Sequence, residues 1–466
     1  MAAQKSAEIA SRLDRLPSSR TVWNIVILIS LGGVFEFYDL FFTGYVAPGM
    51  VQSGLFTPES LGIFAALKPL AVAGFGTFVF ATFAGLWLGA LLFGFVADRY
   101  GRRMVFTWSL VWYAVCTAIM AFQTSGFALD IWRFIAGIGI GVELVTIDTY
   151  ISELVPSHQR GKAYAVNQFI TFLVVPLVAF LAFILKDTHP FGLDYWRVVI
   201  LVGTVGALVV WWLRRHLPES PRWLARHGRE EEAERIVADI ERRVVAEKGG
   251  ITLDKPQPPV PEREGRGSLK EIFGPLYLKR TIILSIFNMA QVIGFYGFAA
   301  WVPTLLISRG IHVTHSLEYA FIIAVANPFG PLIGTLFADK LERKTQIVGG
   351  LVIMGIVIVL FSQASSPSFL IVLGVLFTLA SNVMSYAYHG YQAEVFPTRV
   401  RARAVGFVYS WSRIAAAFAG LAIGILLHNH GVPGVAVFIG ISMVIGICMI
   451  LLGPSTKGLA LEKISH

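Results

Sequence analysis

Several ionisable residues of this sequence fall inside long apolar stretches, where a charge costs several kcal/mol unless it is paired or hydrated. They are Glu36 and Asp39 in the first stretch, Arg133, Glu143 and Asp148 in the fourth, and Arg413 in the eleventh. A carboxyl group in such a place can take up and release a proton, and a guanidinium can hold a carboxylate. These residues are the first candidates for chemistry.

Asp39 and Arg133 are expected at the same depth in the membrane. Asp39 lies seventeen residues beyond Val22, or roughly 25 Å from one edge at the helical rise per residue. Arg133 lies six residues into a stretch that runs the opposite way. An ion pair between the two is therefore allowed, and protonation of Asp39 would release Arg133. The alternative is a static buried pair.

Glu143 lies ten residues beyond Arg133, about 15 Å deeper along the same helix. The rotation over those residues leaves both side chains able to border one cavity. We take Glu143 as a second candidate proton carrier, with a structural pair as the alternative. Glu36 is placed near the mouth of the cavity and Asp148 near an inner gate.

Arg413 lies near the middle of its stretch, ten residues from Arg403, and that stretch contains no acid. A central guanidinium beside Trp411 is suited to the bidentate binding of a carboxylate on an apolar or aromatic substrate. The alternative is a partner acid on another span.

The elements that position these residues are membrane helices. The chain has 466 residues, of which 55% are hydrophobic and only 14% charged, far from the composition of a soluble domain. Twelve apolar stretches are each long enough to span a bilayer; they cover residues 22–46, 72–96, 105–122, 127–152, 163–185, 197–213, 281–307, 318–338, 346–363, 368–393, 404–427 and 432–452. We expect an all-α membrane protein in a lipid bilayer.

The net charge of +9 does not indicate nucleic-acid binding, because the basic residues punctuate alternate loops instead of gathering on one face. That pattern places both termini in the cytoplasm. Cys116 and Cys448 lie inside predicted spans, so a disulfide framework is not expected. The first apolar stretch is too long for a cleavable signal. We expect a multi-pass protein of a bacterial-type inner (plasma) membrane.

One pattern occurs twice at a constant offset of 241 residues. It relates Asp98 to Asp339, Glu153 to Glu394, Pro156 to Pro397 and Arg160 to Arg401. Such an offset predicts two pseudo-symmetric six-helix bundles, as in many secondary transporters. The predicted units are residues 1–213, a cytoplasmic linker with short helices at 214–280, and residues 281–466.

The repeated acids and bases alternate around one membrane face, where ion pairs can latch the two halves together. The alternative is helix capping with topological anchoring. The predicted cytoplasmic gate comprises Gly94, Asp98, Arg102, Glu153, Arg160, Asp339, Glu394 and Arg401.

The first copy, Gly94-x-x-x-Asp98-Arg99-x-Gly101-Arg102-Arg103, resembles the signature loop of the major facilitator superfamily. The second copy is degraded, with Thr335 at the Gly94 position and Glu342 at the Gly101 position. The segment Pro218–Leu224 and the two Glu-x-x-Pro-x-x-x-Arg motifs resemble the sugar-porter branch and its relatives, the metabolite:proton symporters and synaptic-vesicle-protein-2-like carriers. The resemblance implies that Asp39 and Arg133 form a proton switch.

The pocket positions depart from those of hexose carriers. Gln168 matches a sugar-binding glutamine of that family, and one glutamine of the paired motif is kept as Gln291, followed by Tyr296. Val175 and His389 replace a further glutamine and a tryptophan. A site for many hydroxyls needs those lost groups, because unpaired polar atoms in a closed site are costly. The expected substrate-binding residues are Arg413, Gln168, Gln291, Tyr296, Tyr386, His389 and Trp411.

The sequence therefore predicts a secondary transporter that carries a small organic acid together with protons by alternating access. The alternatives are a sugar, polyol or zwitterion carrier, or an exchanger without proton coupling. We find no metal-ligand spacing, nucleophile motif or phosphate loop, so an enzyme is not expected and no cofactor is predicted. The expected partners are a small-molecule substrate and protons, with no nucleic acid, and the expected state is a monomer.

Overall fold

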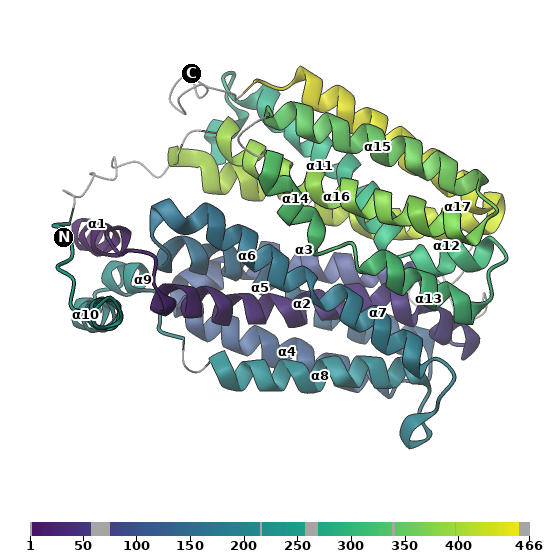
Figure 1. Ribbon diagram of the computed structural model, residues 1–466, viewed down its shortest axis with the longest axis horizontal. Helices are drawn as coiled ribbons and strands as arrows, with labels where there is room; N and C mark the ends of the chain where they lie inside the picture. Colours follow the sequence, from purple (N-terminus) through teal and green to yellow (C-terminus); the bar gives the residue numbers. More distant parts are fainter. Residues whose placement is uncertain are drawn as a thin grey trace.

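A computed structural model describes residues 2–56, 75–214, 217–256, 269–337, 341–396 and 398–455. Long helices run side by side through it (Figure 1). Those of the first half are α2 (Arg20–Gln52), α3 (Phe75–Tyr100), α4 (Arg102–Ala121), α5 (Gly126–Leu154), α6 (Arg160–Phe172), α7 (Val174–Leu185) and α8 (Tyr195–Arg214). Those of the second half are α11 (Leu278–Ala299), α12 (Val302–Ser308), α13 (Val313–Ala324), α14 (Phe329–Phe337), α15 (Arg343–Gln363), α16 (Pro367–Val395) and α17 (Thr398–Leu452).

Each of the twelve predicted apolar stretches has a helical counterpart. In the described part of the chain, nine helices are long and apolar enough to cross a membrane. One of them, α17, supplies two spans, because its backbone breaks at Gly431 with φ of 63°. The apolar part of α3 over Phe75–Leu91 is shorter, and α5 carries several ionisable residues. The fold is the predicted all-α arrangement of twelve membrane helices.

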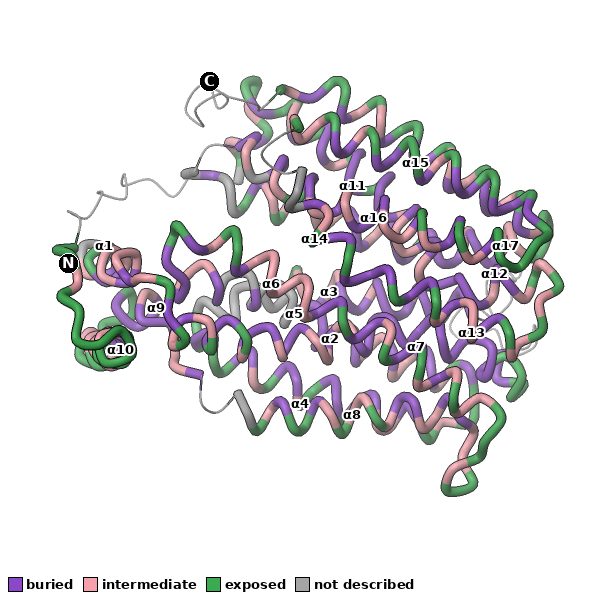
Figure 2. Tube along the Cα trace, in the orientation of Figure 1, coloured by how far each residue is buried: buried purple, intermediate pink, exposed green. Residues whose placement is uncertain are grey.

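The outward faces of the helices are apolar, as contact with lipid requires. Figure 2 shows buried residues where helices meet and exposed ones along the outer sides of α4, α8 and α15. Trp108 on α4 is 60% exposed and Ile356 on α15 is 57% exposed. Exposing apolar side chains to water over so large a surface would be unfavourable, so these faces are suited to contact with lipid.

Glycines bring α3 and α5 into close contact. A Cβ atom added at Gly85 would lie 2.3 Å from the carbonyl oxygen of Phe134, and one at Gly89 would lie 2.1 Å from that of Ile138. Gly141 on α5 makes the matching approach to Leu86, at 2.1 Å. Small residues allow helices to pack through backbone contact in a membrane. Because α5 carries Arg133, this contact fixes the depth of a predicted site residue.

Gly89→Ala is expected to lower the thermal unfolding midpoint, because the added methyl group would press on backbone that cannot rotate away. The expected loss of stability is about 1 to 3 kcal/mol. Gly440→Ala is the matched control, since a Cβ atom there meets nothing within 4 Å. Melting curves of the two purified variants check this, and equal midpoints would contradict the close approach.

Small helices at one end of the molecule form a unit that we call the helical cap: α1 (Ala2–Asp14), α9 (Pro221–Arg226) and α10 (Glu230–Glu247). We call this end the cap side and the opposite end the far side. Ile9 and Leu13 of α1 are fully buried in one apolar cluster with Val237 of α10. The predicted linker helices thus pack against α1, which lies within the range 1–213 that the sequence analysis gives to the first unit.

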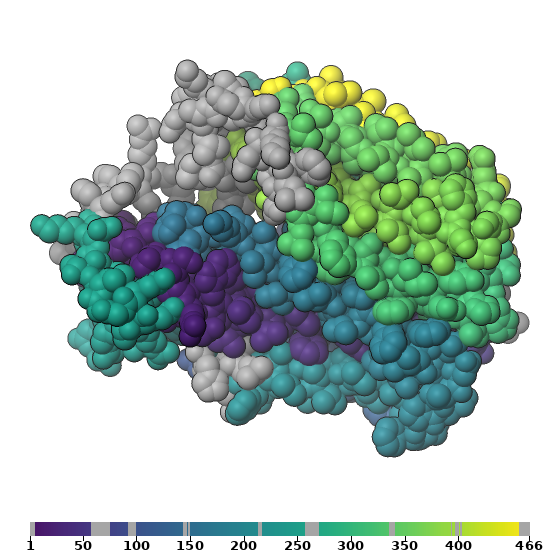
Figure 3. Space-filling model, in the orientation of Figure 1, coloured from purple at the N-terminus to yellow at the C-terminus, as the bar shows by residue number. Residues whose placement is uncertain are grey.

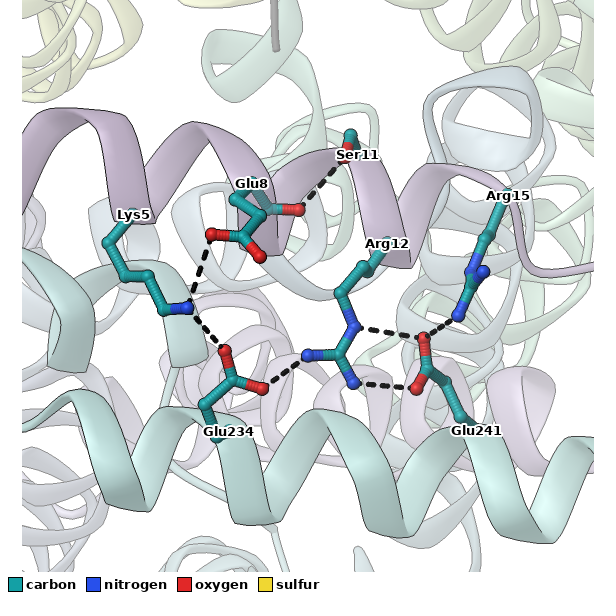
Figure 4. A network of polar contacts seen from close by, with 7 residues as sticks. All are labelled: Lys5, Glu8, Ser11, Arg12, Arg15, Glu234 and Glu241. Atoms are coloured by element: carbon teal, nitrogen blue, oxygen red, sulfur yellow. Dashed lines mark hydrogen bonds and ion pairs between the residues drawn. The ribbon is translucent and has the colours of Figure 1, made fainter. Parts of the chain in front are cut away.

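Ion pairs join α1 to α10 (Figure 4). Lys5 lies 2.9 Å from Glu234, and Arg12 and Arg15 each reach Glu241 at 2.6 Å. Arg12 also pairs with Glu234. Burial favours the neutral form of Glu241, but the hydrogen bonds from both arginines win and lower its pKa. The network therefore stabilises the fold fully at a pH above the ordinary pKa of glutamate. This stabilisation is lost as the pH falls through the lowered pKa of Glu241.

Glu241→Gln is expected to loosen α1, because it removes the charge that Arg12 and Arg15 share. Amide hydrogen exchange in α1 should accelerate by about tenfold, or about 1.4 kcal/mol. Glu231→Gln is the matched control on the same helix, since Glu231 is 91% exposed in its pair with Arg235. Equal exchange in both variants would show that the apolar contacts alone hold α1.

On the far side the two halves are closed on each other. A Cβ atom at Gly44 of α2 would lie 2.9 Å from the carbonyl oxygen of Ala300. Ring contacts continue the seal between halves; they join Phe75 to Trp301 at 5.3 Å, Phe80 to Phe418 at 5.5 Å and Phe180 to Phe321 at 5.2 Å. Figure 3 shows the blue first half meeting the green second half there.

Candidate functional site

The predicted ion pair between Asp39 and Arg133 is present and buried. A terminal nitrogen of Arg133 donates to Oδ2 of Asp39 at 2.6 Å, and the two side chains are 0% and 4% exposed. Arg133 also donates to the Asp39 carbonyl oxygen at 2.7 Å and to the hydroxyl groups of Thr43 and Thr82, each at 2.8 Å. Thr117 donates to the other Asp39 oxygen at 3.2 Å.

The pair and its partners link four helices of the first half, since Asp39 is on α2, Arg133 on α5, Thr82 on α3 and Thr117 on α4. The rings of Phe42 and Phe78 lie 4.7 and 5.3 Å from the guanidinium carbon. Breaking a buried pair leaves an uncompensated charge. Protonation of Asp39 would therefore drive Arg133 to find another partner, which is the property a proton switch requires.

A second buried acid in this half was missed from the sequence. Asp130 lies three residues before Arg133 on α5, is 2% exposed and interacts with Thr77 of α3. Its spacing from Arg133 puts it on the same helix face. The signal was available in the sequence, because Asp130 stands inside the fourth apolar stretch.

Five predicted site positions fall outside the described side chains. They are Gly94, Asp98, Glu143, Asp339 and Arg401, and Asp148 lies outside them as well.

Two ion pairs of the predicted gate acids Glu153 and Glu394 repeat the 241-residue offset in space, although Arg343 is not among the predicted gate residues. A terminal nitrogen of Arg102 lies 3.2 Å from Glu153, and Nε of Arg343 lies 3.4 Å from Glu394. The first pair joins α4 to α5 and the second joins α15 to α16, so each lies within one half. The partner of Glu153 is Arg102 and not the neighbouring Arg160, which lies 3.5 Å from Asp14 of the helical cap.

Glu219, in the loop before α9, fastens the start of α4. Its carboxylate accepts hydrogen bonds from the backbone N–H groups of Arg102 at 2.9 Å and of Arg103 at 3.2 Å. Gly101 has φ of 100°, and a Cβ atom there would lie 2.4 Å from Glu219. Burial raises the pKa of Glu219 despite these donors. This explains why the signature loop has glycine at position 101.

Arg413 is surrounded by phenol groups. It is 5% exposed, and its terminal nitrogens donate to the hydroxyl groups of Tyr296 at 3.4 Å and Tyr409 at 3.2 Å. Its guanidinium carbon also lies 4.9 Å from the Tyr409 ring centre. Within the part of the chain that the structure describes, no carboxylate forms an ion pair with Arg413. Such a guanidinium is available to a ligand carboxylate.

Tyr296 extends this cluster to the other half. Its ring lies 4.7 Å from Phe83 of α3 and 6.5 Å from Phe41 of α2, measured between ring centres. Arg413 thus stands at the interface between the two halves. Aromatic walls on both sides of the interface are suited to a flat apolar ligand body.

The structure brings His389 into the same cluster. It lies on α16, its ring centre is 5.5 Å from that of Tyr409, and it forms hydrogen bonds with the Ser385 carbonyl oxygen at 2.7 Å and the Tyr388 hydroxyl at 3.2 Å. His389 is nevertheless exposed.

The other predicted pocket residues are more dispersed. Trp411 has its ring contact with Phe407 at 6.3 Å, and Tyr386 packs against Gly334 of α14. Gln291 is buried in α11 and Gln168 is half-buried on α6. Sequence reasoning chose Trp411 as the aromatic neighbour of Arg413 and missed Tyr409. The signal was the spacing of four residues, which stacks Tyr409 and Arg413 on one helix face.

Comparison with known proteins decides the family. The sequence profile described as "Sugar (and other) transporter" matches residues 25–466. The chain belongs to this transporter family. YyaJ of Bacillus subtilis, whose name describes a metabolite transport protein, is 30% identical over 96% of each chain. The niacin transporter NiaP of Acinetobacter baylyi is 27% identical over 98% of this chain and 99% of its own.

Solved structures of the major facilitator superfamily share the fold. The xylose transporter XylE from E. coli, in a partially occluded inward-open conformation, superposes with a TM-score of 0.75. It covers 95% of this chain and 100% of its own at 23% sequence identity. The protein is therefore a multi-pass membrane transporter of the sugar-porter-like branch and not an enzyme.

Proposed function

We propose that this transporter carries a small organic acid, recognised as a carboxylate, together with protons. The observation that supports this most strongly is Arg413, a buried guanidinium held by phenol groups at the interface of the halves. Relatives named for niacin and 4-hydroxybenzoate transport, each 27% identical to this chain, point to aromatic acids. Such a ligand would place its carboxylate on Arg413 and its ring among the aromatic side chains.

The buried pair of Asp39 and Arg133 supports proton coupling. A carboxylate that alternates between an ion pair and a protonated state couples proton uptake to a change in packing. The relative named arabinose-proton symporter, 28% identical over 94% of this chain, is consistent with this role. Glu143 stays a second candidate proton carrier.

The remaining assignments follow the same scheme. Gln168, Gln291, Tyr296, Tyr386, His389 and Trp411 are proposed to line the pocket with Arg413. Gly94, Asp98, Arg102, Glu153, Arg160, Asp339, Glu394 and Arg401 are proposed to form the gate on the cap side. We place the cap and both termini in the cytoplasm of a bacterium and the protein, as a monomer, in its inner membrane.

A pentose or polyol is the second candidate substrate. Gln168 and Gln291 match sugar-binding positions of the family, and amide side chains can hydrogen-bond hydroxyl groups. Other sugar-binding positions of the family have lost their polar side chain in this chain, as at Val175, and this argues against a pentose or polyol. Competition between xylose and an aromatic acid for one site distinguishes the two.

Uptake into proteoliposomes tests the proposal. Labelled nicotinate, 4-hydroxybenzoate and xylose would be offered at an acid-outside pH gradient, with and without an uncoupler. We expect accumulation of at least one acid and its loss with the uncoupler. Uptake of xylose alone, or acid uptake that is indifferent to the uncoupler, would contradict the proposed function.

A further inference from the structure

Glu36 is a buried carboxyl group to which the scheme above assigns no role. It lies on α2 three residues before Asp39 and is 0% exposed. The spacing puts it one helical turn toward the cap side of the Asp39–Arg133 pair and on the same helix face. Glu36 thus joins Asp130 as a buried acid beside the proposed proton switch.

Tyr296 connects Glu36 to the pocket in the other half. The Glu36 carboxylate interacts electrostatically with the Tyr296 phenol. The same phenol oxygen accepts a hydrogen bond from Arg413 at 3.4 Å. Tyr296 reaches across the interface, since its ring packs on Phe41 and Phe83 of the first half. Glu36 and Arg413 therefore both act on one tyrosine.

Few other charged groups lie near Glu36. Those nearby among the described residues are Asp39 on α2, Arg133 on α5, and Tyr296 with Arg413 from the second half. Among the other helices packed on α2, α7 (Val174–Leu185) has no ionisable residue, and Gly203 and Gly206 of α8 face Tyr38 and Phe35. The α6 helix places Thr171 beside Gly33 of α2. The Glu143 side chain of α5 lies outside the described part.

An anionic substrate on Arg413 would place a second negative charge near Glu36. Charges of like sign repel strongly in a low-dielectric interior, and one of two neighbouring carboxylates then takes up a proton. An ionised Glu36, in contrast, compensates the buried Arg413 charge when the pocket is empty. The two states differ by one proton and one bound anion.

We propose that Glu36 is a second proton-binding carboxyl group of the transport cycle, ionised while the pocket is empty and protonated when an organic anion binds at Arg413. This inference rests on the proposed function. The proton comes from the solution that the pocket faces and leaves with the anion on the other side. Glu36 thereby couples protonation directly to substrate binding, whereas Asp39 acts on helix packing through Arg133.

Equilibrium binding to the purified full-length chain in lipid nanodiscs tests this without a membrane gradient. Binding of nicotinate or 4-hydroxybenzoate would be measured by calorimetry between about pH 5.5 and about pH 8, where the ligand carboxylate stays ionised. Proton uptake would be followed in weak buffer with a pH indicator. We expect about one proton to be taken up per anion at the higher pH, and the wild-type affinity to fall there by about tenfold for each pH unit.

Glu36→Gln should bind the anion with little pH dependence and without proton uptake, because the amide stays neutral. Glu36→Asp should restore both effects, which separates the role of the acid from a packing role. Asp239→Asn, which removes a carboxylate from the exposed face of α10, is the second control and should keep the pH dependence of binding. Unchanged proton uptake in Glu36→Gln would overturn this inference and leave the proposed function standing. Absence of anion binding in the wild type at every pH would overturn the proposed function, and this inference with it.

Discussion

Asp39→Asn is expected to abolish proton-driven accumulation of the substrate while exchange of labelled for unlabelled substrate continues. An amide cannot take up and release the proton, but it keeps the size of the side chain. Its oxygen can accept from Arg133, and its NH2 group can donate to the Thr117 hydroxyl. One coupled proton supports accumulation of about tenfold for each pH unit of gradient. The variant should reach equal concentrations on both sides of the membrane.

Transport into proteoliposomes with and without an imposed pH gradient measures this difference. Asp239→Asn provides a matched control, because Asp239 pairs with Arg242 and Arg243 on the exposed face of α10. The control should accumulate substrate as the wild type does. Full accumulation by Asp39→Asn would remove Asp39 from the coupling step, and loss of exchange as well would indicate a folding defect instead.

Arg413→Ala is expected to weaken binding of the organic acid by at least about tenfold, and by up to about a thousandfold if the carboxylate is fully buried in the complex. The substitution removes a charged group at the interface of the halves and leaves the ligand carboxylate without its donor. Calorimetric titration of the purified variant with nicotinate or 4-hydroxybenzoate measures the loss.

Two further variants sharpen this result. Arg242→Ala removes an arginine side chain that is 77% exposed on the helical cap and should bind as the wild type does. Tyr409→Phe keeps the ring beneath Arg413 but removes the hydroxyl group that accepts its hydrogen bond, so a smaller loss is expected. Wild-type affinity in Arg413→Ala would place the carboxylate elsewhere.

The sequence predicts much of the fold and one site well. Apolar stretches of the right length give the twelve spans, since lipid permits little besides helices. Helix rise allows the pair of Asp39 and Arg133, because two long spans fix the depth of each residue, and the resemblance to the sugar-porter branch implies it. The buried partners Thr43, Thr82 and Thr117 do not follow, since any of several polar residues at that depth would serve.

Interactions set by helix rotation or by loops are harder to predict. Tyr409 and not Trp411 contacts Arg413, because two residues shift a side chain by about 200° around a helix. Arg102 and not Arg160 pairs with Glu153, because Glu219 and Asp14 position the loops around them. The charged linker helix α10 has the composition of a solvated helix, and only its contacts with α1 reveal the cap.

The most direct test of the account is a simultaneous measurement of substrate and proton movement in proteoliposomes that contain a pH-sensitive dye. External nicotinate or 4-hydroxybenzoate would be added without any imposed gradient, at a pH where the acid is ionised. The account predicts entry of the labelled acid together with acidification of the lumen, and loss of the acidification in Asp39→Asn. Entry of the acid at constant luminal pH would contradict proton-coupled transport by this chain.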